Sequence, residues 1–431
     1  MNPLAEELNN ILDGTIAGRL FSNMGRRLYF PKGIIAQSTE AKKSASVANG
    51  TIGMAYNHGK PMILPAIADN MPAFTPEESV AYAPTAGIEK ARTAWKEHMI
   101  RKNPSLDPEK ISLPVVIAGL TAGLSCTGDL FIGKGSTLIA SDPCWDNYSL
   151  IFETRRQAQM IPVQFLGTGP GLDMEAISAA VKQEAKSGSV RIIFNFPNNP
   201  SGYSATTEEA DALVSLLKET AEGGADVLVI CDDAYFGLFY EDNIYKESLF
   251  AKFANLHERV LAIKLDGPTK EDYVWGLRMG FLTFGSKGLS QAHYDALVRK
   301  LMGAIRSSVS CANTSAQHLM LKVMDDPRTP GEKEKYKAIL QNRYNLVKDF
   351  VKKHPDHHIL QPLPFNSGYF MSFRCNINAE ALRQELLQKH GIGTVSLGDK
   401  CLRVAFSSID EAKISAVYGQ IYDTATQMFK N

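Results

Sequence analysis

The sequence has 431 residues, of which 44% are hydrophobic and 21% charged, so its composition and length are those of a globular protein with a large domain and a smaller one. Lysine and arginine together number 46, as do aspartate and glutamate. The resulting net charge of zero excludes the basic surface that nucleic acids or anionic membranes attract. No signal-peptide pattern and no apolar run of about eighteen residues occurs, so we expect a cytoplasmic protein without a membrane span. The six cysteines are scattered singly, which argues against a metal site or a disulfide framework.

Seven short apolar runs predict strands covered on both faces, because valine and isoleucine recur in them without clean alternation. They are residues 115–118, 136–140, 160–163, 191–195, 227–231, 260–264 and 280–284. Helical patterns separate several of these runs. The clearest begins at "TTEEADALVSLLKE", where Thr206 and Glu209 have the spacing of a capping box. The alternation predicts an α/β domain with a mostly parallel, seven-stranded sheet between helices.

The strand pattern stops near residues 325–333, and a smaller α+β unit is predicted to follow. It begins with a long amphipathic helix. The apolar side of that helix consists of Tyr336, Ile339, Leu340, Leu346, Val347 and Phe350. Two strands follow, at "GYFMSF" and "KCLRVAF".

Polar and aromatic side chains follow the predicted strands, and the carboxyl ends of parallel strands are where such sheets bind ligands. Thr121 lies in a strand-to-helix turn, "GLTAG", which can bind an anion through backbone N–H groups. Trp145 follows the next strand. Asp232 and Asp233 end a buried strand, where a carboxylate needs a cation or donors. Lys270 follows the run at 260–264. Together these residues predict a site with an anion cradle, an aromatic ring, a carboxylate and an amine.

In their order and spacing these motifs resemble the pyridoxal-phosphate-dependent class I/II aminotransferases of fold type I, the aspartate aminotransferase superfamily. In "NNPSG" and "DDAY", the resemblance implies that Asn199 and Tyr235 contact the phenolic oxygen of the cofactor and that Asp232 pairs with its pyridine nitrogen. In "TKEDYVWGLRMG", it implies that Lys270 bonds covalently to pyridoxal 5'-phosphate and that Arg278 binds its phosphate. The family's fold matches the predicted α/β domain with a smaller α+β domain.

Further motifs extend the resemblance over nearly the whole chain. "YAPTAG" implies that Tyr82 reaches the phosphate of a partner subunit, and therefore a homodimer with shared active sites. "DPCWDNY" places Trp145 against the cofactor ring, and "CLRVAF" places Arg403 on the substrate α-carboxylate. The family's phosphate cradle falls on Leu120, Thr121 and Ala122. The implied domains are residues 61–325 for the large cofactor-binding domain, with 1–60 and 326–431 as the two parts of the small one.

Gly267 departs from the family pattern, and Lys264 is a second lysine near the expected position of the catalytic one. Many family members carry serine or threonine three residues before the lysine as a phosphate ligand, whereas this chain has Gly267 there. Thr269 is a candidate replacement. Lys264 is a rival for the role of Lys270, but it lies inside a predicted strand and has no arginine eight residues later. We therefore expect Lys270 to be the catalytic lysine.

The resemblance also suggests substrates. Arg306 falls where dicarboxylate aminotransferases have a partner-subunit arginine for the distal carboxylate, with Ser310 four residues later at a phosphate-contacting position. Gly53 would lie over the substrate, and Phe370 in "GYFMSF" would wall the pocket. We expect ping-pong transfer from aspartate, with tyrosine or phenylalanine as further donors, to 2-oxoglutarate. Alanine aminotransferase, a lyase (carbon–sulfur lyase or β-decarboxylase) and a non-catalytic cofactor-binding regulator are the alternatives.

Overall fold

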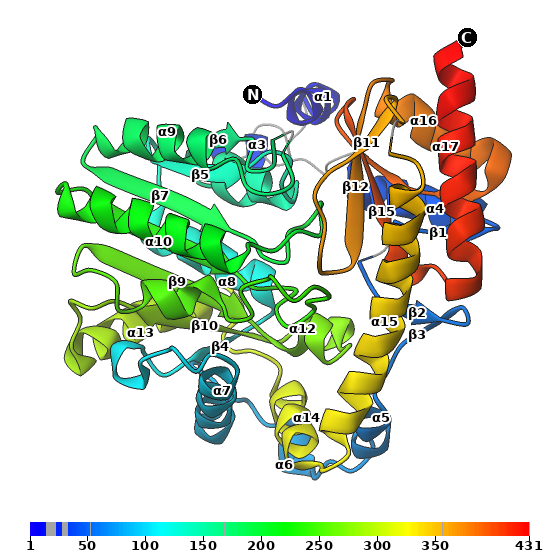
Figure 1. Cartoon of the computed structure of the whole chain (residues 1–431). Coiled ribbons are helices and arrows are strands. Elements are labelled where there is room, and N and C mark those ends of the chain that lie inside the picture. Colours follow the sequence, from blue (N-terminus) through cyan, green and yellow to red (C-terminus); the bar gives the residue numbers. More distant parts are fainter. Residues whose placement is uncertain (14–22, 28–32, 52, 168, 356, 431) are drawn as a thin grey trace.

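A sheet of seven strands forms the centre of the larger part of the molecule (Figure 1). The computed structural model describes residues 1–13, 23–27, 33–51, 53–167, 169–355 and 357–430. The strand order is β4-β10-β9-β8-β7-β5-β6. The bounds are β4 (Val115–Ile117), β5 (Thr137–Ser141), β6 (Gln159–Val163), β7 (Ser189–Phe194), β8 (Asp226–Asp232), β9 (Val260–Asp266) and β10 (Gly280–Gly285). All seven predicted strands are confirmed, each within about two residues at either end, the usual uncertainty of strand limits.

The sheet is mostly parallel, as predicted, since only β10 pairs antiparallel with its neighbours β9 and β4. Successive side chains of a strand point to opposite faces of the sheet, and the side chains of β8 accordingly divide between two apolar clusters. Val227 and Val229 pack in one apolar cluster, whereas Leu228 and Ile230 pack in the other. The first cluster includes side chains of α9 (Met174–Ala185), α10 (Thr207–Glu222) and α11 (Leu249–Phe253). The second includes α8 (Leu120–Phe131) and α13 (Gln291–Arg306). Helices therefore cover both faces.

A smaller α+β unit lies beside the carboxyl end of this sheet (Figure 1). It contains an antiparallel sheet in the order β11-β12-β15-β14, with bounds β11 (Leu360–Pro362), β12 (Phe370–Cys375), β14 (Val395–Leu397) and β15 (Cys401–Ala405). The predicted strands at "GYFMSF" and "KCLRVAF" are β12 and β15. Three helices accompany the sheet: α15 (Thr329–Lys352), α16 (Ala379–His390) and α17 (Ile414–Lys430). The apolar side predicted for α15 packs in the cluster of this unit.

N-terminal segments join both parts. Near the small sheet lies α4 (Ile34–Ser44), and β1 (Ala48–Asn49) pairs in parallel with β13 (Ile392–Gly393). A short hairpin, β2 (Tyr56–Asn57) and β3 (Lys60–Pro61), leads to α5 (Pro65–Asn70) and α6 (Pro76–Val80). The remaining N-terminal helices are α1 (Pro3–Ile11), α3 (Asn23–Arg27) and α7 (Glu89–Lys102). Among the described helices none is long and apolar enough to cross a membrane.

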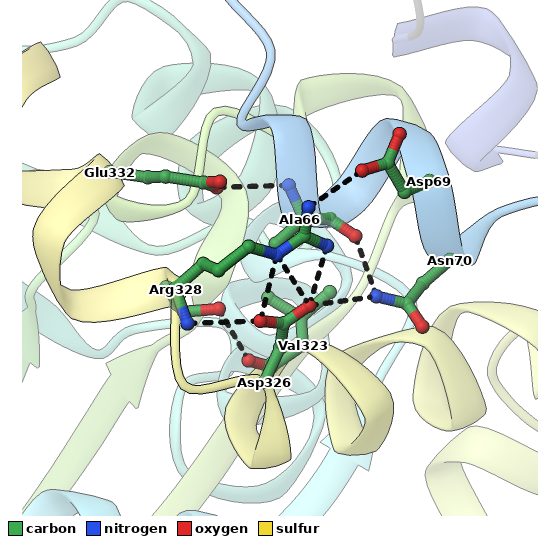
Figure 2. A network of polar contacts seen from close by, with 8 residues as sticks. Ala66, Asp69, Asn70, Val323, Asp326, Arg328 and Glu332 are labelled. Atoms are coloured by element: carbon green, nitrogen blue, oxygen red, sulfur yellow. Dashed lines mark hydrogen bonds and ion pairs between the residues drawn. The ribbon is translucent and has the colours of Figure 1, made fainter.

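An ion-pair network fixes the start of α15 against α5 and the end of α14 (Thr314–Asp325). Figure 2 shows Arg328 between two carboxylates, with its Nη1 2.7 Å from Asp69 and its Nη2 2.8 Å from Asp326. Glu332, one turn into α15, accepts a hydrogen bond of 2.9 Å from the backbone N–H of Ala66. Arg328 holds the pKa of Asp326 down at about 2 through a side-chain hydrogen bond. The long helix therefore has a fixed first turn.

Candidate active site

One cavity of about 320 Å³ gathers most of the residues that the sequence singled out. It lies where the carboxyl ends of the large-sheet strands meet β12 and β15. The predicted residues that line it are Gly53, Leu120, Thr121, Trp145, Asn199, Asp232, Tyr235, Lys270, Arg278, Phe370 and Arg403. The six strands that run parallel to one another, all but β10, point their carboxyl ends at the same edge, so residues far apart in sequence meet there.

Four predicted residues do not line this cavity: Ala122, Tyr82, Arg306 and Ser310, the last of which follows α13. Ala122 lies in the first turn of α8. Tyr82 is 92% exposed, and Arg306 is exposed at the last residue of α13. The roles expected of Tyr82 and Arg306 are in the active site of a partner subunit.

Asp232 ends β8 and is 3% exposed. Its Oδ2 accepts a hydrogen bond of 2.5 Å from the hydroxyl of Tyr148, whereas its Oδ1 is buried and has no partner among the described residues. Burial raises the pKa of Asp232 to about 6, although the Tyr148 hydrogen bond and the charge of Lys270 act against this rise. Asn195 Nδ2 donates to the Asp232 carbonyl at 2.7 Å and fixes the strand end. Oδ1 is thus free to accept a hydrogen bond from a ligand.

Lys270 lies in α12 (Pro268–Glu271), the single turn that follows β9. Its Nζ is 4.9 Å from the ring centroid of Tyr235. Burial lowers the pKa of the Lys270 amine to about 8; Asp232 acts against this shift, and the positive charge of Arg278 adds to it. An amine with this pKa exists partly in the neutral form that reacts with aldehydes and accepts protons.

Arg278 and the N-terminus of α8 form an anion site. Gly119, the N-cap of α8, has φ of 83°, a conformation that glycine adopts readily. A Cβ on Gly119 would lie 2.5 Å from Arg278 Nη2, so only glycine leaves room for the guanidinium there. No side chain caps the helix, which leaves the first N–H groups, at Leu120 and Thr121, available for an anion.

Arg403 on β15 forms the opposite side of the cavity and is 2% exposed. Its Nη1 donates to Asn199 Oδ1 at 2.9 Å, and its Nη2 donates to the carbonyl of Thr51 at 2.9 Å. The guanidinium carbon lies 4.3 Å from the ring centroid of Phe370, and Nε has no partner within the described chain. Burial lowers the pKa of Arg403, but an arginine stays charged at neutral pH. This fixed cation suits a carboxylate.

Gly267 has a steric explanation. A Cβ at this position would lie 2.8 Å from Gly280 Cα and 3.2 Å from the carbonyl oxygen of Met279, so strand β10 passes too close for a serine or threonine. Thr269, the candidate replacement, donates its hydroxyl proton to the Met279 carbonyl at 3.3 Å. Because the Met279 carbonyl already accepts the hydroxyl proton of Thr269, this hydroxyl is a poor donor to a phosphate, although its oxygen can still accept a hydrogen bond.

Lys264 is fully buried within β9 and forms ion pairs with Asp233 and with Asp266, the latter at 3.3 Å. Burial would lower the pKa of Lys264, but the two carboxylates raise it. This lysine does not line the cavity. The geometry therefore favours Lys270 as the reactive amine, as expected.

Several residues of the site escaped sequence reasoning. Ile34, Met54, Asn195, Ala234 and Trp275 also line the cavity. The Trp275 Nε1 is buried without a partner among the described residues. Tyr148, behind Asp232, is the last residue of "DPCWDNY", three residues after Trp145. The position of Tyr148 just after a predicted strand could have marked it as a candidate. Its hydrogen-bond partner Asp232, however, is 84 residues away in the chain.

The free groups of the cavity fit pyridoxal phosphate. Asp232 Oδ1 offers an acceptor for a protonated ring nitrogen, and Arg278 with the N-terminus of α8 offers donors for a phosphate. Lys270 offers the amine, and Trp145 an aromatic face. A reactive amine, a buried carboxylate and an anion-binding helix end at one edge of a seven-stranded sheet define a pyridoxal-phosphate enzyme of fold type I.

Comparison with known proteins specifies the family. The model of the aminotransferase class I and II family matches residues 52–421, and the chain belongs to this family of pyridoxal-phosphate-dependent aminotransferases. An aspartate aminotransferase of Geobacillus stearothermophilus is 23% identical over 77% of this chain and 78% of its own length. A probable N-acetyl-LL-diaminopimelate aminotransferase of Bacillus subtilis is also 23% identical, and the match spans only 63% of that relative's length and 63% of this chain.

Solved structures share the fold. A crystal structure of an aminotransferase from Anaerococcus prevotii matches with a TM-score of 0.82 and 22% identity over 94% of this chain and 98% of that one. The kynurenine aminotransferase of Pyrococcus horikoshii, solved with PMP, matches with a TM-score of 0.79 and 17% identity over 98% and 100% of the two chains. These likenesses bear out the predicted fold class.

Proposed function

We propose that this enzyme transfers the amino group of an L-amino acid to a 2-oxo acid such as 2-oxoglutarate in a ping-pong sequence. Aspartate is the favoured donor, and tyrosine and phenylalanine are further donors. One observation carries this proposal: Lys270, with its lowered pKa, lies in one cavity with the carboxylate Asp232 and the buried cation Arg403. An amine, a partner for a ring nitrogen and a carboxylate grip are the three groups that such a reaction needs.

The chain's own residues would divide the work as follows. Bound pyridoxal phosphate supplies a ring that takes up electrons when an amino acid loses its Cα proton. Asp232 would accept the ring N–H through Oδ1, and Asn199 and Tyr235 would contact the phenolic oxygen. Lys270 would hold the cofactor and, once the substrate displaces it, accept the proton from Cα, because part of its amine is neutral near pH 8.

Substrate orientation would come from two arginines. Arg403 would bind the α-carboxylate in its fixed, buried fork. Arg306 would reach the distal carboxylate of aspartate in the neighbouring subunit of a homodimer, where Tyr82 would also contact the phosphate. The apolar side chains of Met54 and Phe370 line the same cavity, and such a wall suits an aromatic donor. A Cβ on Gly53 would lie 3.4 Å from the Phe370 ring, so a larger residue there would fill the substrate space.

We also propose a division of the chain into domains. Residues 61–325 would form the large cofactor-binding domain, and residues 1–60 and 326–431 would form the small domain. The pairing of β1 with β13 and the packing of α4 against β14 support the assignment of the N-terminal part.

The reaction type can be tested with the holoenzyme and aspartate alone. We expect one equivalent of oxaloacetate per site, with conversion of the cofactor to pyridoxamine phosphate, and no further turnover until 2-oxoglutarate is added. Repeated turnover to alanine and carbon dioxide without an oxo acid would instead identify a β-decarboxylase.

Donor choice can be tested with Arg306→Ala. We expect kcat/KM for aspartate to fall by about 10- to 100-fold, the value of a hydrogen bond to a charged group, with little change for phenylalanine. Arg299→Ala, an exposed arginine of the same helix, is the matched control. Equal losses for both donors, or none for aspartate, would contradict the role of Arg306.

A further inference from the structure

Tyr148 is a tyrosine behind Asp232 that no part of the reaction described above uses. It is 2% exposed and does not line the active-site cavity. Its hydroxyl donates to Asp232 Oδ2 at 2.5 Å, which is short for a hydrogen bond between a hydroxyl and a carboxylate. Because Tyr148 is buried, water does not compete for that bond.

The two oxygens of the Asp232 carboxylate are therefore not equivalent. Oδ2 is engaged by Tyr148, whereas Oδ1 is buried without a partner among the described residues. A carboxylate that can rotate would present either oxygen to a ligand, but a carboxylate bound at Oδ2 presents only Oδ1. The direction of the free oxygen is thus set by a residue on the turn after β5.

We propose that Tyr148 is a positioning residue for the reaction, one that holds Oδ2 of Asp232 so that Oδ1 faces the cofactor site and the carboxylate remains ionised during catalysis. This inference rests on the proposed role of Asp232 as the partner of the ring nitrogen. Tyr148 does not contact the reacting atoms; it acts through Asp232.

Charges around Asp232 support the second part of this role. Burial raises the pKa of Asp232, and so does the negative charge of Asp233, whose carboxylate pairs with Lys264. Opposing them are the Tyr148 hydrogen bond, the charge of Lys270 and the backbone N–H of Ala234. Tyr148 therefore helps to keep a buried carboxyl group charged, since a donor to the ionised form lowers its pKa. Burial and the charge of Asp232 raise the pKa of Tyr148 well above its ordinary value, so its hydroxyl keeps its proton.

Tyr148 also supports the aromatic side of the cavity. Its ring packs edge-to-face against Trp145, with centroids 5.6 Å apart and planes at 79°. Phenylalanine would preserve this ring contact and remove only the hydroxyl. Tyr148→Phe therefore separates the hydrogen bond from the packing.

The test compares Tyr148→Phe with Tyr344→Phe. Tyr344 is another buried tyrosine that donates to a carboxylate, that of Glu241, and it lies outside the cavity lining. The pKa of Asp232 is measured by NMR titration of cofactor-free protein whose aspartate carboxyl groups carry ¹³C, and the Asp232 signal is assigned as the one that Asp232→Asn removes. We expect this pKa to be raised by about one unit or more in Tyr148→Phe and to be unchanged in Tyr344→Phe. In the holoenzyme the acid limb of kcat should move to higher pH by a similar amount, and the dissociation constant of pyridoxal phosphate should rise.

An unchanged pKa of Asp232 in Tyr148→Phe, or an equal shift in Tyr344→Phe, would overturn the proposal. The NMR titration uses no substrate, so a wrong assignment of the amino donor leaves this result intact. If Tyr148→Phe does not fold, 3-fluorotyrosine at position 148 takes its place. This more acidic phenol donates more strongly and should lower the pKa of Asp232, and a pKa that stays the same or rises would count against the role.

Discussion

Asp232 carries a buried charge that its surroundings only partly balance. Burial raises its pKa to about 6 in the folded chain, against about 3.9 for an aspartate in an unfolded chain. A group with a raised folded pKa contributes stability below its unfolded pKa, and that stability is lost as the pH rises through the folded value. The ionised carboxylate therefore destabilises the cofactor-free protein by about 3 kcal/mol at pH 7.

Asp232→Asn should reveal this cost. The amide is similar in size, can still accept from Tyr148 and carries no charge. We expect the cofactor-free variant to be more stable than wild type at pH 7.5 by about 1–3 kcal/mol, with the difference shrinking toward pH 4.5. Urea unfolding at both pH values measures it. Asp226→Asn, at the exposed start of the same strand, should show no comparable pH-dependent gain. A variant less stable than wild type at both pH values would refute the cost.

Sequence motifs predicted which side chains share the cavity better than they predicted how those side chains are held. Lys270 and Asp232 were found because each follows a predicted buried strand, and Arg403 was found because its segment resembles a motif of the family. Tyr148 was missed because its function depends on a bond across 84 residues. The glycine at 267 was seen as a departure, but its reason, the close approach of Gly280, exists only in three dimensions.

The turn that carries Lys270 is held from outside the cavity by a cluster of ion pairs. Glu271 lies 2.5 Å from Lys102 of α7 and 2.7 Å from Lys333 of α15. Lys333 also lies 2.6 Å from Asp272. Burial would raise the pKa of Glu271, but Lys102 and Lys333 hold it well below its usual range. Because the network in Figure 2 pairs the start of α15 with α5 and with the end of α14, the cluster connects the turn that carries Lys270 to these helices.

Lys333→Met should loosen that connection. Removing Lys333 leaves Asp272 without its ion-pair partner and takes one cation from Glu271, which keeps Lys102. We therefore expect a loss of about 1–3 kcal/mol in the free energy of unfolding at pH 7. A carboxyl group with a lowered folded pKa contributes stability above its unfolded value of about 4.3, and this stability is lost as the pH falls through the folded value. The penalty should therefore persist to about pH 4 and decline below it. Urea unfolding tests this. Lys335→Met, exposed on the same helix, is the control, and equal effects of the two variants would show that the cluster contributes nothing special.

Helices and strands were predicted correctly where residues close together in the sequence determine them. The capping box of Thr206 and Glu209 correctly placed the start of α10, with both reciprocal hydrogen bonds present. The cluster around Glu271 was not predicted, because its members come from α7, α12 and α15. Charged residues at distant positions look like ordinary surface residues in a sequence.

For the molecule as a whole, the strongest untested expectation is that an active site is completed by a second subunit. Tyr82 is 92% exposed, and Arg306 is exposed at the end of α13. Val80 and Val309, near each of them in sequence, are exposed apolar residues at 82% and 48%. Tyrosine and arginine are enriched at interfaces between protein chains, so exposed Tyr82 and Arg306 suit such a surface.

Subunit complementation decides whether the sites are shared. Lys270→Ala and Tyr82→Ala/Arg306→Ala proteins should each be nearly inactive with aspartate. When equal amounts are unfolded and refolded together, half of the dimers are mixed, and each mixed dimer has one site with a wild-type Lys270 from one chain and wild-type Tyr82 and Arg306 from the other. Activity should then return to about a quarter of wild type, because symmetric dimers exchange equivalent surfaces. Mixing Lys270→Ala with Asp232→Ala should restore nothing, since both residues line the cavity of one chain. No restoration in the first mixture would place Tyr82 and Arg306 in the site of their own chain or outside any site. Restoration in the second would contradict the placement of Lys270 and Asp232 in the cavity of one chain.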